Sequence, residues 1–540
     1  MSVFEILPNL ASYSPDDSIE IEIRGACDDG ELTVWHLGQL VKEMPVRGEV
    51  RAQLGQLPTG GYGIELRTKD GLVRTAIEVR ESKRARLRYG FVTDYSPNRD
   101  LSGVSDNIRR LHLSAIQFYD WAYRHADLMG GGDNYKDALN QPISLQTVRD
   151  LVGTVQTVGS SALGYAAVYG VGPNEWTHWQ HRALLTATRQ TYGLGDFLFL
   201  VDPASPDWSD HFTQQLKEAV DKIHFDGFHL DQYGYPKIAL RADGSIVDLS
   251  ASFAAIITSV RKVLPSEQLV FNNVNDFPTW VTSHSPQDAI YIEVWEPNIT
   301  LNSLAHIVNR ARNLESQKPI VIAAYQHVFD LAPADASNLA MAFTMATLFS
   351  HGATQILAGE EDRILVDPYY VRNHKIEEST RVLLRSWYDF VVEYDELLLD
   401  PRIVDVTSSY GGSYNDDCDV TFVDVKVNDR GDPGSIWRRI TASPTGLVVH
   451  LINLVNQEDT LWDSPRRAPH DPGIGKLKFR RVGGTTPTVT VADPDLQPRM
   501  IELEVTLDGD YAYATLPKMN IWQVLLIRFT PDQLERAEID

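Results

Sequence analysis

Two acidic segments of the chain carry the residue types that cleavage of a glycosidic bond requires. Phe225-Asp-Gly-Phe-His-Leu-Asp231 is a largely apolar stretch that ends in a carboxylate, and Tyr291-Ile-Glu293-Val-Trp-Glu296 offers two glutamates beside a tryptophan. Such a reaction uses one carboxylate at the anomeric carbon and one carboxylic acid that protonates the leaving oxygen. We predict that Asp231 is the nucleophile and that Glu293 or Glu296 is the acid/base.

The period of a β-strand favours Glu293 over Glu296. Glu293 and Trp295 fall on one side of an alternating strand, whereas Glu296 falls on the opposite side or beyond its end. A glutamate beside an aromatic ring in a barrel mouth is desolvated, which raises its pKa toward the range of a general acid. For direct attack by Asp231 we expect the two carboxyl groups about 5 to 5.5 Å apart, rather than roughly 6.5 to 9.5 Å. Two plainer explanations stay open: Asp231 as a helix cap or arginine partner, and Glu296 as a solvent-facing side chain.

Polar and aromatic residues at other predicted strand ends match what sugar hydroxyls and sugar faces bind. The segment Asp120-Trp-Ala-Tyr-Arg-His125 gathers a carboxylate, two aromatic rings, a cation and an imidazole, which packing alone explains poorly. For a single asparagine or histidine, a hydrogen-bonded loop residue is an equally good explanation. The predicted substrate-binding residues are Asp94, Asp120, Trp121, Tyr123, His125, Tyr169, His229, Gln232, Asn272, Asn273, Trp295 and Gln326.

These side chains need a scaffold that brings many strand ends together. Short apolar strands alternate with longer helical stretches from about residue 86 to 400, which predicts parallel βα units. The predicted strands cover residues 88–93, 115–119, 163–169, 197–201, 227–230, 269–274, 289–294, 319–325 and 354–358. We interpret 197–201 as an accessory strand. The other eight predict a (β/α)8 TIM barrel with its site at the carboxyl ends of the strands, and an open doubly wound sheet is the weaker alternative.

Strand-rich segments flank this central region. Short strands separated by turns are predicted at residues 18–24, 31–35, 49–54, 63–67 and 73–79, and period-two segments return at 419–426, 446–453, 501–507 and 521–529. We therefore predict an N-terminal β-sandwich over residues 1–85, the catalytic barrel over 86–404 and a C-terminal antiparallel β-sandwich over 405–540.

Charge and hydropathy limit the classes of partner. A formal net charge of -24 repels phosphate backbones, so no nucleic-acid partner is predicted. No apolar run approaches the roughly 18 residues of a membrane span, so no membrane partner is predicted either. The start of the chain has neither a basic nor a long apolar signal region, which predicts a cytoplasmic protein, or a secreted one if this is a mature form. The sequence leaves the oligomeric state open.

No cofactor is predicted to be required. The chain has no Gly-rich phosphate loop, no His-Glu-x-x-His segment and no Gly-x-Ser-x-Gly elbow, so the common nucleotide, metalloprotease and serine-hydrolase signatures are absent. Residues 359–362 and 415–417 form acidic loops with the oxygen ligands that calcium takes, but solvated charge explains them better. A structural calcium is therefore not indicated.

Five strings give the sequence a family likeness. They are Tyr89-Gly-Phe, Ile116-Gln-Phe-Tyr-Asp-Trp-Ala-Tyr-Arg-His, Asp226-Gly-Phe-His-Leu-Asp-Gln, Tyr291-Ile-Glu-Val-Trp and Arg363-Ile-Leu-Val-Asp-Pro-Tyr-Tyr. With them the chain resembles glycoside hydrolase family 66, the dextranases and cycloisomaltooligosaccharide glucanotransferases, over the whole barrel. The second string is long and unusual, and it makes the match specific.

The resemblance implies a retaining enzyme that cleaves internal α-1,6-glucosidic linkages of dextran or isomaltooligosaccharides through a covalent glucosyl-aspartate intermediate. The family roles carry over to Asp231 as nucleophile and Glu293 as acid/base, and Asp120 matches an aspartate associated with activity. The resemblance also implies an immunoglobulin-like N-terminal domain and a Greek-key C-terminal domain.

The sequence departs from the family pattern in two respects. Cyclising members carry a carbohydrate-binding module inserted in the barrel, and residues 86–400 have no room for one, which favours plain hydrolysis. The missing signal peptide admits imported isomaltooligosaccharides beside polymeric dextran as substrate. Two alternatives stay open: transglycosylation or cyclisation of the same glucans, and a barrel that binds carbohydrate without catalysis.

Overall fold

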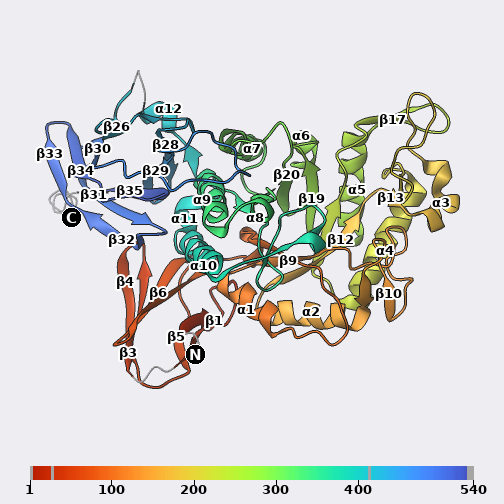
Figure 1. Cartoon of the computed structure of the whole chain (residues 1–540), viewed down its shortest axis with the longest axis horizontal. Coiled ribbons are helices and arrows are strands. Elements are labelled where there is room, and N and C mark those ends of the chain that lie inside the picture. The colour runs from red at the N-terminus through yellow and green to blue at the C-terminus, as the bar shows by residue number, and fades with distance from the viewer. Residues whose placement is uncertain (1–3, 26–28, 412–414, 484, 532–540) are drawn as a thin grey trace, which may run out of the picture.

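The computed structural model describes residues 4–25, 29–411, 415–483 and 485–531. A central barrel is joined to two groups of antiparallel sheets. Figure 1 shows both groups on the same side of the barrel, although they come from opposite ends of the chain. The predicted fold class, a TIM barrel flanked by two β-sheet regions, is confirmed.

Eight parallel strands form the barrel sheet, in the order β22-β21-β20-β19-β16-β12-β9-β8. Their bounds are β8 Tyr89–Val92, β9 Ala115–Phe118, β12 Ser161–Ala167, β16 Gly227–Asp231, β19 Gln268–Val274, β20 Ala289–Glu293, β21 Ile320–Ala323 and β22 Thr354–Gln355. Almost all of their residues are buried, because helices cover the outer face and side chains fill the interior. The predicted accessory strand is β15 (Leu198–Leu200), which pairs outside the barrel with β13 (Gly170–Val171) and β14 (Gly193–Leu194).

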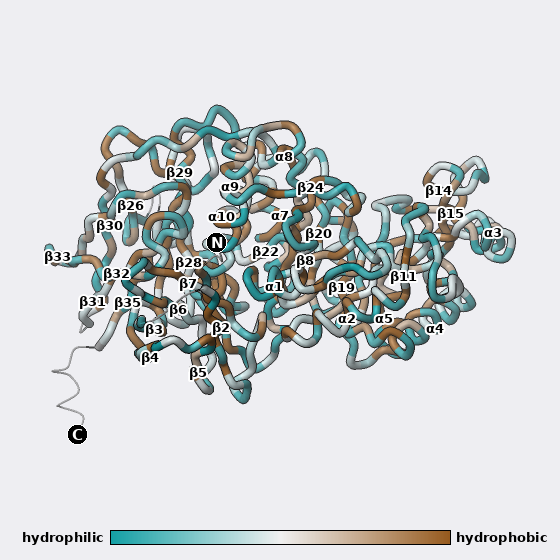
Figure 2. The backbone as a smooth tube through the Cα atoms, turned by 60° about the horizontal axis from the view of Figure 1, so that its bottom comes forward, coloured by the Kyte–Doolittle hydropathy of each residue, from teal (hydrophilic) through white to brown (hydrophobic). Residues whose placement is uncertain are grey.

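Every barrel strand is followed by helical structure. The helices are α1 Ser102–Arg110, α2 Leu145–Thr157, α3 Pro173–Trp179, α4 Pro206–Ile223, α5 Leu249–Val263, α6 Thr279–Thr282, α7 Leu301–Leu314, α8 Val328–Leu331, α9 Ala334–His351, α10 Glu378–Glu393 and α11 Asp395–Leu398. Local sequence sets several ends: Ser144 caps α2, Asp248 caps α5, and α4 ends at His224 in the left-handed conformation. Figure 2 shows hydrophilic and hydrophobic residues alternating along α2, α4 and α5, as expected for helices with one face on the barrel.

Three short hairpins extend the loops at the carboxyl ends of β9, β16 and β22. They pair β10 Asn134–Lys136 with β11 Pro142–Ser144, β17 Ile238–Leu240 with β18 Ile246–Asp248, and β23 Arg363–Ile364 with β24 His374–Lys375. In a barrel of this kind these loops surround the site.

The barrel closes between its first and last strands without a regular ladder. The Thr354 hydroxyl donates a hydrogen bond to the Leu87 carbonyl at 2.5 Å. The loop after β22 then passes so close to β8 that a Cβ on Gly359 would lie 2.1 Å from the Phe91 carbonyl oxygen. Glycine is required there because no side chain fits between the two backbones.

Seven N-terminal strands form two sheets, ordered β1-β2-β5 and β4-β3-β6-β7. Their bounds are β1 Glu5–Pro8, β2 Ile19–Arg24, β3 Gly30–His36, β4 Gln39–Val46, β5 Arg51–Gly55, β6 Gly60–Thr68 and β7 Gly71–Val79. Five of them were predicted. The sequence pattern missed β1, which is short, and β4, an edge strand whose first three residues, including Leu40 and Val41, are all exposed.

The C-terminal strands form one sheet ordered β25-β28-β29-β35-β31-β32, with β27 beside β28, and a second ordered β26-β30-β34-β33. The bounds are β25 Val404–Asp405, α12 Thr407–Tyr410, β26 Cys418–Phe422, β27 Val427–Asn428, β28 Ile436–Ser443, β29 Gly446–Asn453, β30 Gly475–Arg480, β31 Thr485–Asp493, β32 Gln497–Leu503, β33 Val505–Asp508, β34 Tyr511–Thr515 and β35 Trp522–Pro531. Helix α9 is buried on nearly every side, because Trp522 and Leu526 of β35 share one apolar cluster with it and with the barrel.

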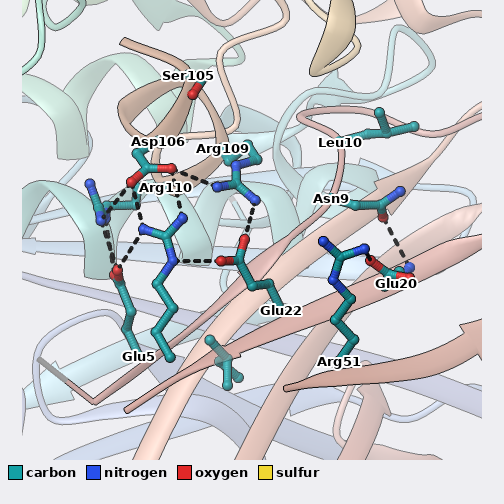
Figure 3. A network of polar contacts seen from close by, with 12 residues as sticks. Glu5, Asn9, Leu10, Glu20, Glu22, Arg51, Ser105, Asp106, Arg109 and Arg110 are labelled. Atoms are coloured by element: carbon teal, nitrogen blue, oxygen red, sulfur yellow. Dashed lines mark hydrogen bonds and ion pairs between the residues drawn. The ribbon is translucent and has the colours of Figure 1, made fainter. Parts of the chain in front are cut away.

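Ion pairs attach the N-terminal sheets to the barrel. Figure 3 shows Arg109 and Arg110 of α1 reaching Glu22 and Glu5 of the first sheet, each at 2.7 Å. The boundaries 1–85, 86–404 and 405–540 stay predictions, because one apolar cluster runs across both junctions. Within the described ranges no helix is long and apolar enough to cross a bilayer.

Candidate active site

A cavity of about 410 Å³ opens at the carboxyl ends of the barrel strands. Asp231 is the last residue of β16 and Glu293 the last of β20, and both line this cavity. Strand β19 lies between β16 and β20 in the sheet, and it presents Asn272 between the two carboxyl groups. The barrel thus brings together two acids that lie 62 positions apart in the sequence.

Protein donors reach both carboxyl groups in nearly the same way. The Tyr165 hydroxyl donates to Asp231 Oδ2 at 2.7 Å, and the Tyr325 hydroxyl donates to Glu293 Oε1 at 3.2 Å. The remaining oxygens, Asp231 Oδ1 and Glu293 Oε2, accept hydrogen bonds from the single amide nitrogen of Asn272, at 2.7 and 2.8 Å. Because both oxygens contact one nitrogen, they are no farther apart than the sum of these distances, 5.5 Å.

Burial changes the pKa of both acids. Desolvation, followed by repulsion from Asp231, raises the pKa of Glu293 from 4.5 to about 7, and hydrogen bonds from Asn272 and Tyr325 oppose the rise. Desolvation also raises the pKa of Asp231, against donors from Tyr165 and Asn272. With a pKa near 7, Glu293 holds a proton through much of the neutral range, while the closer donor on Asp231 favours its anion.

Eight of the predicted site residues line the cavity. They are the pair Asp231 and Glu293 together with Asp120, His125, His229, Gln232, Asn272 and Trp295. Asp120 follows β9 with a positive φ of 47°, an uncommon backbone for aspartate, and burial raises its pKa well above the usual range. Burial lowers the pKa of His125 to about 4 and that of His229 to about 3, so both imidazoles are neutral at pH 7.

Four predicted substrate-binding residues do not reach the cavity, which corrects the sequence prediction. Trp121, Tyr169, Asn273 and Gln326 are fully covered by protein and leave no surface for a sugar. The Trp121 indole donates to the Tyr165 carbonyl, and the Tyr169 hydroxyl donates to the Tyr235 carbonyl, so these rings support the cavity wall from behind.

Three further candidates lie outside the cavity lining. Asp94 is exposed and accepts a hydrogen bond from the Ser96 backbone. Tyr123 packs edge-on against Tyr135. Glu296 is exposed beyond the end of β20, so the structure leaves Glu293 as the buried glutamate of this segment.

The sequence prediction missed every tyrosine that lines the cavity. They are Tyr119, Tyr165, Tyr233, Tyr291, Tyr325, Tyr369 and Tyr370. Tyr119 and Tyr370 stack at 4.4 Å between ring centroids. One signal was available, since Tyr291 lies two residues before Glu293 and therefore faces the same side of the strand. The other lining residues that were missed are Gln117, Leu139, Leu194, Phe197, Leu198, Val274 and Pro368.

The acidic loops considered for calcium direct carboxylates to cations of the protein. Glu360 pairs with Arg99, and Asp416 pairs with Lys478 at 2.7 Å. In the part of the chain that the structure describes, no group of three or more His, Cys, Asp or Glu residues is placed to hold a metal ion.

Comparison with known proteins decides the family. The model of Glycosyl hydrolase family 66 matches residues 11–526. The chain belongs to this family. The resemblance inferred from the sequence is thereby confirmed.

Several family 66 relatives match at low identity. Two cycloisomaltooligosaccharide glucanotransferases of Niallia circulans are 25% and 20% identical to this chain, covering 97% and 82% of it and 72% and 62% of their own lengths. The chain therefore spans less than two thirds of one of these relatives. A dextranase of Streptococcus salivarius is 25% identical over 153 residues, 25% of this chain and 18% of that protein.

A solved structure matches the fold. The crystal structure of a cycloisomaltooligosaccharide glucanotransferase from Paenibacillus sp., complexed with cycloisomaltoheptaose, has a TM-score of 0.88 at 18% identity and covers 97% of this chain and 100% of that one. This likeness in fold covers the flanking sheets as well as the barrel.

Proposed function

We propose that the protein is a retaining, endo-acting glycoside hydrolase of α-1,6-glucosidic linkages in dextran or isomaltooligosaccharides. The observation that carries the proposal is the pair Asp231 and Glu293, which are at most 5.5 Å apart by their nearest oxygens and share one cavity. That separation supports direct attack on the sugar, because an inverting pair leaves roughly 6.5 to 9.5 Å for a water molecule.

In the proposed first step the Asp231 carboxylate attacks the anomeric carbon. The bond from that carbon to the glycosidic oxygen breaks, and Glu293 gives its proton to the departing oxygen. A glucosyl ester of Asp231 results. In the second step the Glu293 carboxylate removes a proton from water, and the resulting hydroxyl displaces Asp231 with a second inversion, so that the anomeric configuration is retained.

The electrostatics of the pair support this exchange of roles. The negative charge of Asp231 is one cause of the raised pKa of Glu293. That charge disappears when Asp231 forms the ester. The pKa of Glu293 then falls, and the residue becomes a base for the second step.

The choice of linkage rests on the relatives. The names of the curated relatives and of the solved structure give cyclic isomaltooligosaccharides and dextran as their products or substrates. Trp295 lines the cavity and is 40% exposed, so it offers a flat aromatic surface of the kind that pyranose faces bind.

Hydrolysis is favoured over cyclisation because part of a related glucanotransferase has no counterpart in this chain. The match to one glucanotransferase runs over 703 aligned positions, whereas this chain has 540 residues, so at least 163 positions of that relative have no counterpart here. Cyclising members are expected to carry a module inserted in the barrel, and we infer that the unmatched positions include it, so water is the proposed acceptor.

Incubation with dextran tests the proposal. We expect new reducing ends, linear isomaltooligosaccharides of several lengths, and products that first appear as the α-anomer in NMR spectra. Asp231→Asn is expected to lose about 10⁴-fold or more in kcat while it still binds dextran. Cyclic products would favour the glucanotransferase alternative, and binding without cleavage by the wild type would favour the non-catalytic one.

A further inference from the structure

We propose that Asn272 is a positioning residue that holds Asp231 and Glu293 at the separation required for direct attack and leaves the acid proton of Glu293 facing the cavity. The reaction named here rests on the proposed function. The geometry rests on the structure alone. This role differs from the substrate contact that the sequence suggested for Asn272.

The position of Asn272 in the sheet makes one amide sufficient for both acids. Strand β19 pairs with β16 on one side and β20 on the other, and Leu230 is in register with Phe271 while Val274 is in register with Glu293. The side chain of Asn272 therefore emerges between the two acidic strand ends. Its amide nitrogen has two hydrogens, and each is directed to one carboxylate.

The amide also determines the separation. The two N–H bonds of a planar amide diverge by about 120°, so acceptors at 2.7 and 2.8 Å along them lie about 4.8 Å apart. An amide oxygen in this place would face two acceptors, which makes the nitrogen the only favourable end. A movement of either carboxylate breaks one of the two hydrogen bonds.

The same contacts direct the proton of Glu293. The Glu293 carboxyl group accepts hydrogen bonds from Tyr325 on one oxygen and from Asn272 on the other, and the Trp295 side chain is a third donor. When Glu293 is protonated, its hydrogen must take a lone-pair direction that none of these donors occupies. Because Glu293 lines the cavity, we propose that this direction faces the cavity, where the glycosidic oxygen is placed by the proposed reaction.

The environment of the Asn272 amide oxygen indicates that this arrangement lowers the free energy of unfolding. Asn272 Oδ1 is buried and has no hydrogen-bond partner among the residues that the structure describes, and Asn272 is 3% exposed. A buried unsatisfied acceptor costs about 1–3 kcal/mol, so packing alone would favour an apolar side chain here. Such a local conflict is expected where function constrains the residue. The buried oxygen is also unable to bind a sugar hydroxyl.

Two variants of Asn272 test the proposal. Asn272→Ala removes both donors, and the nearly isosteric Asn272→Asp replaces them with a third carboxyl group, which keeps the fold accessible if the alanine variant fails to fold. The matched control is Asn273→Ala, since Asn273 is as buried and lies on the same strand. Among the described residues its side chain bonds Thr282 and the carbonyls of Tyr291 and Phe271, and neither catalytic acid.

The first readout is the titration of Glu293 in protein labelled with ¹³C at glutamate side-chain carboxyls, with the signal assigned by its loss in Glu293→Gln. In both Asn272 variants Glu293 should titrate at higher pH than in the wild type, because a donor to the carboxylate is gone. In the control Asn273→Ala, Glu293 should titrate at the same pH as in the wild type. This measurement uses no substrate, so it tests Asn272 even if dextran is never cleaved.

The second readout is kinetic. We expect kcat/KM to fall about 10²-fold in both Asn272 variants and the alkaline limb of its pH profile to move upward, since a displaced carboxyl pair loses orientation. An unchanged Glu293 titration in a folded variant, or an equal change in Asn273→Ala, would overturn the proposal. A shifted titration together with an inactive wild type would instead overturn the proposed function.

Discussion

Two buried glutamates, Glu293 and Glu393, have the same raised pKa in different surroundings. Their side chains are 8% and 1% exposed, and desolvation raises the pKa of each to about 7. Glu293 ends a barrel strand in the open cavity. Glu393 ends α10, which packs on β6 and β7, and the adjacent Tyr394 hydroxyl bonds Pro498 and Met500 of β32. A raised pKa alone therefore identifies burial and not function.

The partners of the two glutamates account for the difference. Glu293 accepts hydrogen bonds from neutral donors and faces a second carboxylate across the cavity. Glu393 contacts Arg74 at 2.6 Å and the Tyr394 hydroxyl at 2.8 Å, and a Cβ on Gly63 would lie 2.5 Å from its carboxyl group. One glutamate is left free to give up a proton, whereas the other is packed as part of a junction.

The largest expected effect separates the two glutamates by activity. Glu293→Gln should lower kcat on dextran by about 10² to 10⁴-fold, because the general acid is lost, and Glu393→Gln should stay within about threefold of the wild type. In the wild type kcat/KM should fall above about pH 7, where Glu293 loses its proton, and Glu393→Gln should keep that limb. A loss of activity in Glu393→Gln that matches Glu293→Gln would contradict the comparison.

The two glutamates differ in their effect on activity, but both should make the stability of the fold depend on pH in the same direction. The folded pKa of each is about 7 and the ordinary value is 4.5, so the unfolded chain ionises first as the pH rises from 4.5 to 7 and the folded state loses stability over that window. Each glutamate then costs on the order of 3 kcal/mol at pH 8. Both glutamine variants should gain unfolding temperature relative to the wild type as the pH rises from 4.5 to 8, and Glu393→Gln should start from a lower value because it leaves Arg74 without a buried partner. Calorimetry at both pH values measures this, and a variant whose advantage shrinks with rising pH would refute the assignment.

Removal of one hydroxyl beside each glutamate gives a smaller contrast. Tyr325→Phe takes away the donor to Glu293 Oε1, so kcat/KM should drop by about fivefold and its alkaline limb should move upward. Tyr394→Phe takes away a hydroxyl that contacts Glu393 and also accepts from the Met500 backbone. That variant should lower the unfolding temperature and leave the pH profile of activity unchanged. Kinetics and thermal unfolding of the pair, measured together, distinguish the two outcomes.

The smallest expected effect concerns Glu296, which the sequence left as an alternative acid. It is exposed and lies outside the cavity lining. Glu296→Gln should therefore change kcat/KM by no more than about twofold. A loss on the scale of Glu293→Gln would reverse the choice between the two glutamates.

Strand ends were predictable because their physical signal is local. The apolar runs before Asp231 and Glu293 specify strands by hydropathy, and the period of two places Glu293 on the side that Glu296 does not share. The same reasoning predicted that the side chains of Trp121 and Gln326 bind substrate, but both are fully buried. Both residues follow strands, but the chain turns there and packs their side chains behind the wall, and strand periodicity does not extend past the strand.

The sequence by itself determined which residues form the barrel strands, that Asp231 and Glu293 end two of them, and the family to which the chain belongs. Only the tertiary structure decided that β19 lies between those two strands, that the amide of Asn272 joins their carboxyl groups, and that Glu393 is buried at a junction instead of in a cavity. The physical reason is that hydropathy and period act within a few residues, whereas the meeting of side chains from different strands depends on the order and closure of the whole sheet.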